Sequence, residues 1–431
     1  MLRDLKIRPI LISTSSFQFL SFLRRAIFYA FFYIYLRTFL GLSNTLSALL
    51  GTANLAGSSI GQLFLWGPRL NRNPSLAKKY IIRGEVIAGC AYILAFFGHK
   101  AIITLHSNIS AAIFLIIILS FLEIFWSGSD LGIRHLIADA TEGEQRGRLV
   151  GTIDAMGLLG QICGFLLSGW LYQNGLGFYE GTIFYIVVFL LFLCAFIIQI
   201  TPIKVRKISE MISTVGLAKN GVREVLKVPF FTFFIIILGI LTMGLSASTQ
   251  IFLYYATDIT GFNLTDQLLS ILLILFSLSG GLLAPVGGRF SDRFGRIPII
   301  ILSSLVASIC YILFFIFATL PFGSIALIYA ILGGTTALVQ SIAFSYTADL
   351  LPQDLQGTGF GIFNITLATG WGLAGFLIGG PIADFLILLG ESRAVAYRFT
   401  FFVSSFIILI GTTTLISLNA LQSKYYSTNL D

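Results

Sequence analysis

The feature that most limits the fold of this chain is the number and length of its apolar segments. Segments such as 109–125 and 230–239 are predominantly apolar and show no strand-like alternation. A helix needs about 20 such residues to cross a bilayer, which leaves room for roughly a dozen spans in the chain. Spanning segments must be helices or closed barrels, and barrel strands alternate between apolar and polar residues. The pattern therefore predicts an all-α integral membrane protein.

The composition agrees with lipid as the main solvent. Only 11% of the 431 residues are charged, whereas soluble domains carry roughly 25%. We expect the net charge of +8 to reflect basic loops on one side of a membrane and not a nucleic-acid partner. The cysteines fall within apolar segments and the three histidines are scattered. We therefore expect packing cysteines, no metal site and no cofactor.

Twelve helical spans are predicted, in two sets of six. We expect an N-terminal bundle over 1–200, a cytoplasmic linker over 201–229 and a C-terminal bundle over 230–431. The linker is polar and basic. The predicted spans are 10–36, 45–66, 81–98, 109–133, 150–173, 181–200, 230–256, 266–287, 297–318, 324–347, 359–386 and 397–418.

The orientation follows from the basic residues in the loops. Most of the 27 lysines and arginines fall on one side of the predicted spans. The loops on the other side hold Arg37, Lys100, Arg393 and Arg398. This asymmetry predicts a multi-pass protein of the cell membrane, plasma or inner, with both termini in the cytoplasm.

The two sets of spans resemble each other. At a constant spacing, Asp139, Gly147, Gly151, Gly160 and Gly169 align with Asp349, Gly357, Gly361, Gly370 and Gly379. A parallel repeat of this kind predicts a binding site near the middle of the membrane, between the halves. The glycines of the fifth span also predict close contact with a neighbouring helix.

One loop carries a recognisable motif. Between the eighth and ninth spans the chain reads Gly288-Arg-Phe-Ser-Asp292-Arg293-Phe-Gly295-Arg296. It resembles motif A of the major facilitator superfamily, and Gly67-Pro-Arg-Leu-Asn71-Arg72 is a degenerate first-half copy. With the layout of two six-helix halves, the resemblance covers essentially the whole chain. It implies an alternating-access transporter of two parallel-repeat six-helix bundles, in which this loop latches the cytoplasmic side in one state.

Simple physics suggests how such a latch would work. Gly288 and Gly295 allow a tight turn, and Asp292 can pair with Arg293 or Arg296 or face the helix that starts near Gly359. The alternative is that the arginines only set topology. The predicted gating residues are Gly288, Asp292, Arg293, Gly295, Arg296, Asn71, Asp139, Arg146, Arg148 and Asp349.

Ionisable residues within membrane spans are costly and point to function. Arg25 and Tyr29 share a polar stripe of the first span, from which Arg24 deviates. Glu123 and Asp130 share a face of the fourth span with Trp126 between them. By the superfamily pattern both spans line the cavity, where Arg25 and Glu123 could meet. A carboxyl group removed from water is more easily protonated, so Glu123 or Asp130 could carry a proton. The alternative is a structural ion pair.

The second half offers neutral polar groups instead. The candidates for the cavity are Gln250 and Tyr254 on the seventh span, Gln340 on the tenth and Asn364 on the eleventh. Such groups orient a ligand by hydrogen bonds, although they also bond helix to helix. Paired arginines in the cavity would suit a neutral or amphiphilic solute, and an unpaired one would suit an anion.

We therefore expect a secondary transporter that moves a small organic solute by alternating access, acts as a monomer in the lipid bilayer and uses protons as the coupling ion. An uncoupled facilitator and a transporter-like receptor that binds without translocation are the alternatives. An enzyme is not expected, because the sequence has no catalytic cluster, Gly-x-Ser-x-Gly motif or phosphate loop. The drug-antiporter signature of the superfamily has a proline in the fifth span, where Gln161 stands here.

Overall fold

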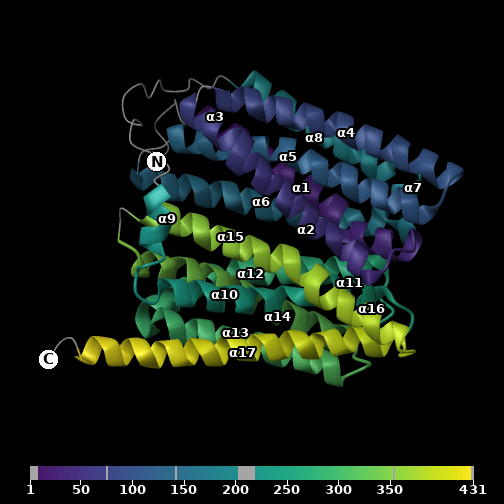
Figure 1. The fold of residues 1–431 in the computed structure, drawn as a ribbon. Coiled ribbons are helices and arrows are strands. Elements are labelled where there is room, and N and C mark those ends of the chain that lie inside the picture. The colour runs from purple at the N-terminus through teal and green to yellow at the C-terminus, as the bar shows by residue number, and fades with distance from the viewer. Residues whose placement is uncertain (1–7, 74–75, 141–142, 202–218, 353–354, 429–431) are drawn as a thin grey trace. The chain divides into compact units, whose positions relative to one another are not determined.

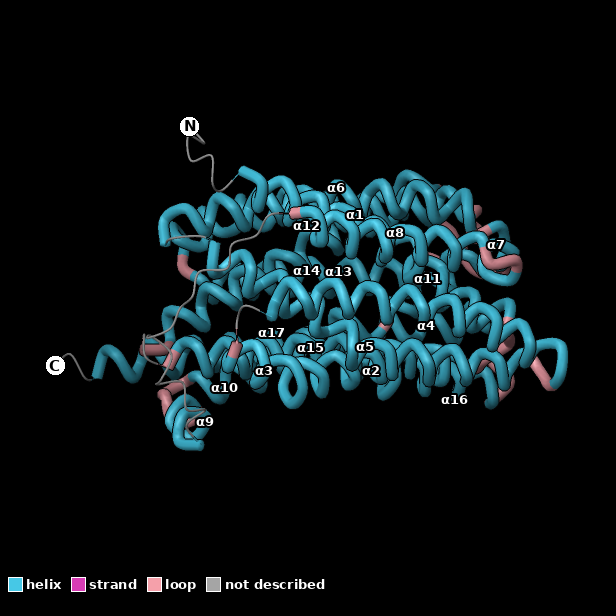
Figure 2. Tube along the Cα trace, turned by 90° about the horizontal axis from the view of Figure 1, so that it is seen from above, coloured by secondary structure: helices cyan, strands magenta, loops and turns pink. Residues whose placement is uncertain are grey.

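The computed structural model describes residues 8–73, 76–140, 143–201, 219–352 and 355–428, which are almost entirely helical and contain no strand (Figure 1, Figure 2). The first half contains α1 (Arg8–Ile34), η1 (Tyr35–Phe39), α2 (Asn44–Ile60), η2 (Gly61–Trp66), α3 (Gly67–Arg72), α4 (Ala77–Leu105), α5 (Asn108–Ala140), α6 (Gly143–Leu171), η4 (Gln173–Gly175), α7 (Leu176–Tyr179) and α8 (Thr182–Ile200). The second half contains α9 (Lys219–Val225), α10 (Phe231–Ala247), α11 (Thr249–Thr257), α12 (Asp266–Phe294), α13 (Arg296–Ile316), α14 (Phe322–Leu350), α15 (Gln356–Ala374), η5 (Gly375–Gly379), α16 (Gly380–Leu388) and α17 (Arg393–Thr428).

Eleven helical segments among the described residues are long and apolar enough to cross a bilayer. They coincide with eleven of the twelve predicted spans. The remaining prediction, 45–66, falls on α2 and η2. The helices are longer than predicted at several ends, because helical backbone continues into the polar boundary of the membrane. Most of the predicted linker, residues 202–218, lies outside the described residues.

The chain forms two compact units. Unit 1 comprises the described residues within Met1–Leu42, Thr52–Thr214 and Asp266–Ser270, and unit 2 those within Ser43–Gly51, Val215–Thr265 and Ile271–Asp431. Short segments at the start of α2 and of α12 are therefore exchanged relative to the order of the chain. The bundle boundaries predicted at 200 and 230 stay a prediction.

Small residues bring helices together in both units. In unit 1, a Cβ atom added at Gly160 of α6 would overlap the carbonyl oxygen of Phe19 on α1. In unit 2, a Cβ atom added at the repeat partner Gly370 on α15 would overlap the side chain of Thr242 on α10. The expected close approach of the fifth span is thus confirmed. Lipid offers little hydrophobic drive for helix association, so such backbone contacts carry much of the packing.

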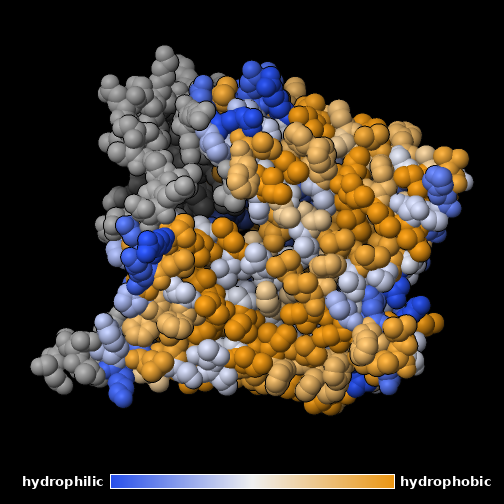
Figure 3. Space-filling model, viewed as in Figure 1, coloured by the Kyte–Doolittle hydropathy of each residue, from blue (hydrophilic) through white to orange (hydrophobic). Residues whose placement is uncertain are grey.

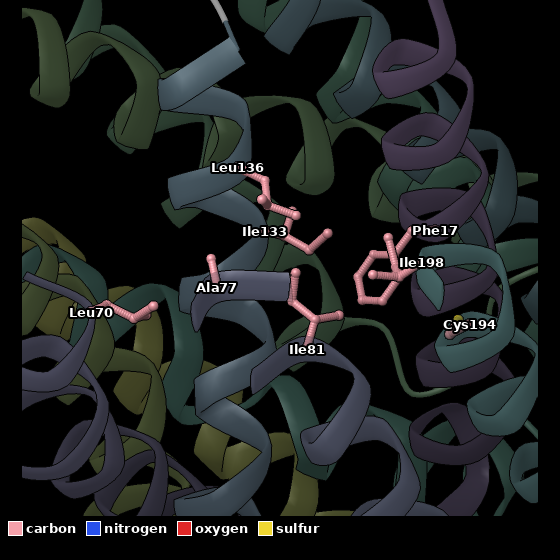
Figure 4. Packing of buried hydrophobic residues seen from close by; sticks show 8 residues of the cluster. All are labelled: Phe17, Leu70, Ala77, Ile81, Ile133, Leu136, Cys194 and Ile198. Atoms are coloured by element: carbon pink, nitrogen blue, oxygen red, sulfur yellow. The ribbon is translucent and has the colours of Figure 1, made fainter. Parts of the chain in front are cut away.

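An apolar core in unit 1 joins five helices (Figure 4). Its members come from α1, α3, α4, α5 and α8: Phe17, Leu70, Ala77, Ile81, Ile133, Leu136, Cys194 and Ile198. Cys194 is a packing residue, as predicted, and so is Cys310 in unit 2, whereas Cys90 is exposed. All described cysteines are free thiols.

The outer surface is apolar along the helices. Large side chains such as Phe189, Phe233 and Phe406 are exposed. In Figure 3, hydrophobic side chains cover the lengths of the helices, and hydrophilic ones gather towards their ends. A water-soluble protein rarely exposes so much contiguous apolar surface, so this pattern indicates contact with lipid.

The start of α2 is fixed to α16 within unit 2. Asp384 accepts hydrogen bonds from the backbone N and Nδ2 of Asn44, at 3.0 and 2.8 Å, and from the backbone N and Oγ1 of Thr45, at 2.8 and 2.6 Å. Tyr397 donates to Oδ1 of Asn44 at 3.3 Å. A carboxylate at a helix N-terminus satisfies free N–H groups and interacts favourably with the helix dipole.

Candidate functional site

An ion pair joins the first and fourth predicted spans in unit 1. Nη2 of Arg25 on α1 lies 2.7 and 2.6 Å from Oδ1 and Oδ2 of Asp130 on α5. Each side chain is 32% exposed. The partner of Arg25 is therefore Asp130 and not Glu123. Since these spans run in opposite directions, Arg25 lies level with the later acid, and Tyr29, one turn further on α1, lies level with Glu123.

Glu123 is joined by hydrogen bonds to a series of uncharged side chains. Its Oε1 accepts from the hydroxyl of Tyr29 at 3.4 Å. Asn54 of α2 donates from Nδ2 to that hydroxyl at 3.4 Å and accepts from Ser120 of α5 at 3.1 Å. Sequence reasoning did not single out Asn54, although an amide in the middle of a predicted span was a usable signal. Glu123 is half-buried, so a solute or water can reach it.

A second charged pair lies deeper in unit 1. Nη2 of Arg24 is 3.7 Å from Oε2 of Glu85 on α4, and the side chains are 1% and 0% exposed. Oε1 of Glu85 accepts from Nε1 of Trp126 at 2.8 Å and from Ser129 at 2.6 Å. Sequence reasoning missed Glu85, although an acid within the predicted span 81–98 was a signal. Arg24 deviates from the polar stripe because it points to this pair.

Trp126 connects the two pairs. It is 2% exposed. The Cζ atoms of Arg24 and Arg25 lie 3.8 and 4.8 Å from its ring centroid. Both distances fall within the range of cation–π attraction. Trp126 is therefore a buried support for both guanidinium groups and not an exposed wall for a ligand.

The second-half candidates lie in unit 2. Gln250 is half-buried, and its Oε1 has no hydrogen-bond partner among the described residues. Tyr254 is 3% exposed, with its ring 6.3 Å from that of Tyr397. Gln340 on α14 is half-buried and Asn364 on α15 is exposed. Their common cavity with the unit 1 residues stays a prediction.

The motif loop forms a compact ion-pair network in unit 2. Arg296 contacts Asp292 at 2.5 Å, Asp349 at 3.1 Å and the hydroxyl of Ser291 at 2.7 Å. It thereby joins the start of α13 to the ends of α12 and α14. Of the two arginines considered, the structure pairs Asp292 with Arg296, whereas Arg293 lies over the ring of Phe294 at 5.5 Å.

The two motif glycines differ in their roles. Gly295 has φ +92° and forms the turn between α12 and α13, a conformation that favours glycine. Gly288 lies inside α12, and a Cβ there would meet open space. The expectation that Gly288 forms the turn is wrong, because the helix continues to Phe294. The side chains of four predicted gating residues lie outside the described residues: Asn71, Asp139, Arg146 and Arg148.

Comparison with known proteins identifies the family. The model of the Major Facilitator Superfamily matches residues 14–375. The chain belongs to this superfamily. It is a multi-pass membrane protein of a transporter superfamily, not an enzyme. The eleven spans, together with α2 and η2 in the place of the second predicted span, form the twelve-helix fold of the superfamily.

Curated relatives match over part of their length. The tetracycline resistance protein, class C, of Escherichia coli is 31% identical over 156 residues, which is 36% of this chain and 37% of that protein. Multidrug resistance protein 2 of Bacillus subtilis (strain 168) is 29% identical over 153 residues, which is 35% of each chain. The matched region thus spans about a third of each relative.

Solved structures share the fold across the whole chain. The nucleoside transporter NupG has a TM-score of 0.71 at 14% identity, covering 95% of this chain and 98% of that one. A bacterial homologue of the human lysosomal transporter Spinster, inward-facing and unoccupied, has a TM-score of 0.70 at 14% identity, covering 96% and 97%. At such identities the likeness concerns the fold alone.

Proposed function

We propose that this transporter couples the movement of a small neutral or amphiphilic organic solute to protons, and that Glu123 carries the proton. The observation that supports this most is the charge balance around Trp126 and Tyr29. Arg24 faces Glu85 and Arg25 faces Asp130, which leaves Glu123 as the third carboxyl group of the cluster.

A carboxyl group in this position is suited to bind and release a proton. Among the described residues, Glu123 accepts a hydrogen bond from the neutral hydroxyl of Tyr29, at 3.4 Å. Among the described residues, the two arginines of the cluster contact other acids and not Glu123: Arg25 contacts Asp130 and Arg24 contacts Glu85. Asp130, by contrast, has a charged partner at 2.6 Å. Of the two acids that the sequence proposed as proton carriers, the geometry favours Glu123.

The same pairing supports the proposed solute. Both arginines of the cluster have carboxylate partners, so neither offers an unpaired positive charge to an anion. A neutral or amphiphilic molecule could use Tyr29, Asn54 and Ser120 as hydrogen-bond partners. The relatives named for resistance to tetracycline and to multiple drugs support testing drug-like compounds first.

The proposed transport cycle is alternating access. In it, the bundles over 1–200 and 230–431 would open the solute site to either side in turn. Gln250, Tyr254, Gln340 and Asn364 would supply neutral recognition, and the Asp292–Arg296 network would latch the cytoplasmic side. The orientation belongs to the same proposal: reporter fusions after residues 215 and 431 should both give cytoplasmic signals. An outward signal at either position would refute it.

The test is transport in proteoliposomes with an imposed proton gradient and a pH-sensitive dye inside. A panel of neutral, cationic and anionic drug-like solutes is screened with the native protein, Glu123→Gln, Asp130→Asn and Glu180→Gln. Glu180 is an exposed acid after α7 and serves as the control. We expect solute-dependent proton movement in the native protein and the control, and its loss in Glu123→Gln.

The other outcomes identify the alternatives. Solute flux without proton movement in the native protein would show a facilitator or another coupling ion. Binding without flux would favour a receptor. Unchanged proton coupling in Glu123→Gln would remove that residue from the proposal.

A further inference from the structure

The buried pair of Arg24 and Glu85 has unsatisfied polar atoms. Among the described residues, Nε and Nη1 of Arg24 and Oε2 of Glu85 have no hydrogen-bond partner. The closest approach of the two charged groups is 3.7 Å, too long for a hydrogen bond. A buried ion pair with incomplete bonding contributes little stability compared with apolar side chains of the same size. Stability alone therefore does not account for the pair.

The contacts of Glu85 point to a positioning role. Its Oε1 holds the indole N–H of Trp126 at 2.8 Å and the hydroxyl of Ser129 at 2.6 Å. The position of the indole ring on α5 therefore depends on a carboxylate of α4. Arg24 lies over that ring at 3.8 Å. Glu85 therefore holds the edge of the indole ring of Trp126, and Arg24 covers its face.

Trp126 in turn contacts the neighbouring Arg25, whose Cζ lies 4.8 Å from the ring centroid. Arg25 has three acids within electrostatic reach, Asp130, Glu123 and, with the smallest effect, Glu85. The structure places its guanidinium on Asp130 at 2.6 Å. A ring that moved would let the guanidinium move towards Glu123.

We propose that Arg24 and Glu85 are positioning residues, which hold Trp126 so that Arg25 pairs with Asp130 and leaves Glu123 free. This inference rests on the proposed role of Glu123 as the proton carrier. If Arg25 approached Glu123, its positive charge would favour the ionised carboxylate. Proton loading, and with it transport, would then require a lower pH.

Within the part of the chain that the structure describes, few other charged groups could produce such a shift at Glu123. Arg24, Arg25 and Tyr29 face it from α1, and Asp130 acts on it from its own helix, α5. The other polar groups of this region are uncharged at neutral pH: the amide of Asn54 on α2 and the phenols of Tyr29 and, on α4, Tyr92. Arg25 is therefore the charge whose displacement would matter most.

The decisive variant is the double substitution Arg24→Gln with Glu85→Gln. It removes both charges, so that no buried ion is left unpaired, and it keeps an oxygen acceptor for Trp126 and Ser129. The loss of the Arg24 charge by itself would favour the protonated form of Glu123, but Arg25 has the larger electrostatic effect on that group. We therefore expect near-native abundance in the membrane and a transport profile whose half-maximal pH is lower by about half a unit or more, roughly a threefold change in proton affinity. The matched control is Ser308→Ala with Ser405→Ala, which removes a buried 2.7 Å hydrogen bond in unit 2 and should keep the native profile.

A native pH profile in the double variant at normal abundance would overturn the inference and make the pair structural. If the double variant does not accumulate, Trp126→Phe decides, since it keeps all charges and removes the N–H that Glu85 holds. That variant should also shift the profile, and an unchanged profile would again overturn the inference. Proton movement that persists in Glu123→Gln would instead refute the proposed function. The two proposals are therefore tested by different variants and different measurements.

Discussion

Asp384→Asn should destabilise the protein by about 3 kcal/mol. The carboxylate accepts four hydrogen bonds from the start of α2, two at Asn44 and two at Thr45. An asparagine keeps one oxygen acceptor and turns its NH₂ group towards the other donors. Two hydrogen bonds to a charged group are then lost, each worth about 1.5–3 kcal/mol. Because Asp384 is only half-buried and water replaces part of the loss, we take a value near the lower sum.

The assay is thermal unfolding of purified protein in detergent, followed by size-exclusion chromatography with fluorescence detection. A loss of about 3 kcal/mol corresponds to a fall in Tm of roughly 5–10 °C for a unit of this size. The control is Asp258→Asn, whose carboxylate bonds Thr260 two residues away and lies 3.9 Å from the exposed Arg393. Because the bonds to Thr260 are local and the contact with Arg393 is long, this variant should change Tm by less than Asp384→Asn. Equal Tm values for Asp384→Asn and the native protein would refute the reasoning from these four bonds.

Two further predictions concern packing and the motif loop. Gly160→Leu should severely reduce the abundance of the protein in the membrane, because the leucine side chain would displace the backbone of α1 at Phe19. Its control, Gly361→Ala, places a Cβ atom in open space and should keep native abundance in the same fluorescence measurement. Asp292→Asn should lower solute uptake several-fold. It should change the free energy of unfolding by about 1 kcal/mol or less, because exposed ion pairs contribute little and Arg296 keeps its ion pair with Asp349. Native uptake in this variant would mean that the loop serves only to set the topology.

The fold was largely predictable because the membrane imposes simple rules. Length and apolarity locate the helices along the chain. They do not determine where each helix ends, since α4 ends at Leu105 and α17 at Thr428, beyond the predicted ends at 98 and 418. The repeat is also visible in the packing, since Gly160 contacts the backbone of α1 and Gly370 contacts a side chain of α10. Two predicted spans contain π-helical backbone that was not predicted: the second joins α2 to η2, and the eleventh joins α15 to α16 through η5. Such local hydrogen-bond irregularity leaves little trace in hydropathy.

The sequence predicted most of the charged residues of the site, but not which acid pairs with which arginine. Helical spacing placed Arg25, Glu123 and Asp130 on inward faces, but which acid meets Arg25 depends on the vertical offset between two helices. The spacing of residues along a single helix gives no information about that offset. Glu85 was missed for a related reason: its partner Arg24 deviates from the polar stripe, and the two meet only where the folded bundle brings α1 and α4 together.

The exchange of short segments between the units has a consequence for the history of the chain. The residues 43–51 at the start of α2 and 266–270 at the start of α12 belong to the second and eighth spans, which correspond in the repeat. A gene split at the linker would therefore leave Asp384 on one fragment and its four donors on the other. Neither fragment would have a complete set of polar partners, and the two should accumulate only when made together. An ancestral half-length chain with the same exchange would have needed a second copy of itself before its gene was duplicated and fused.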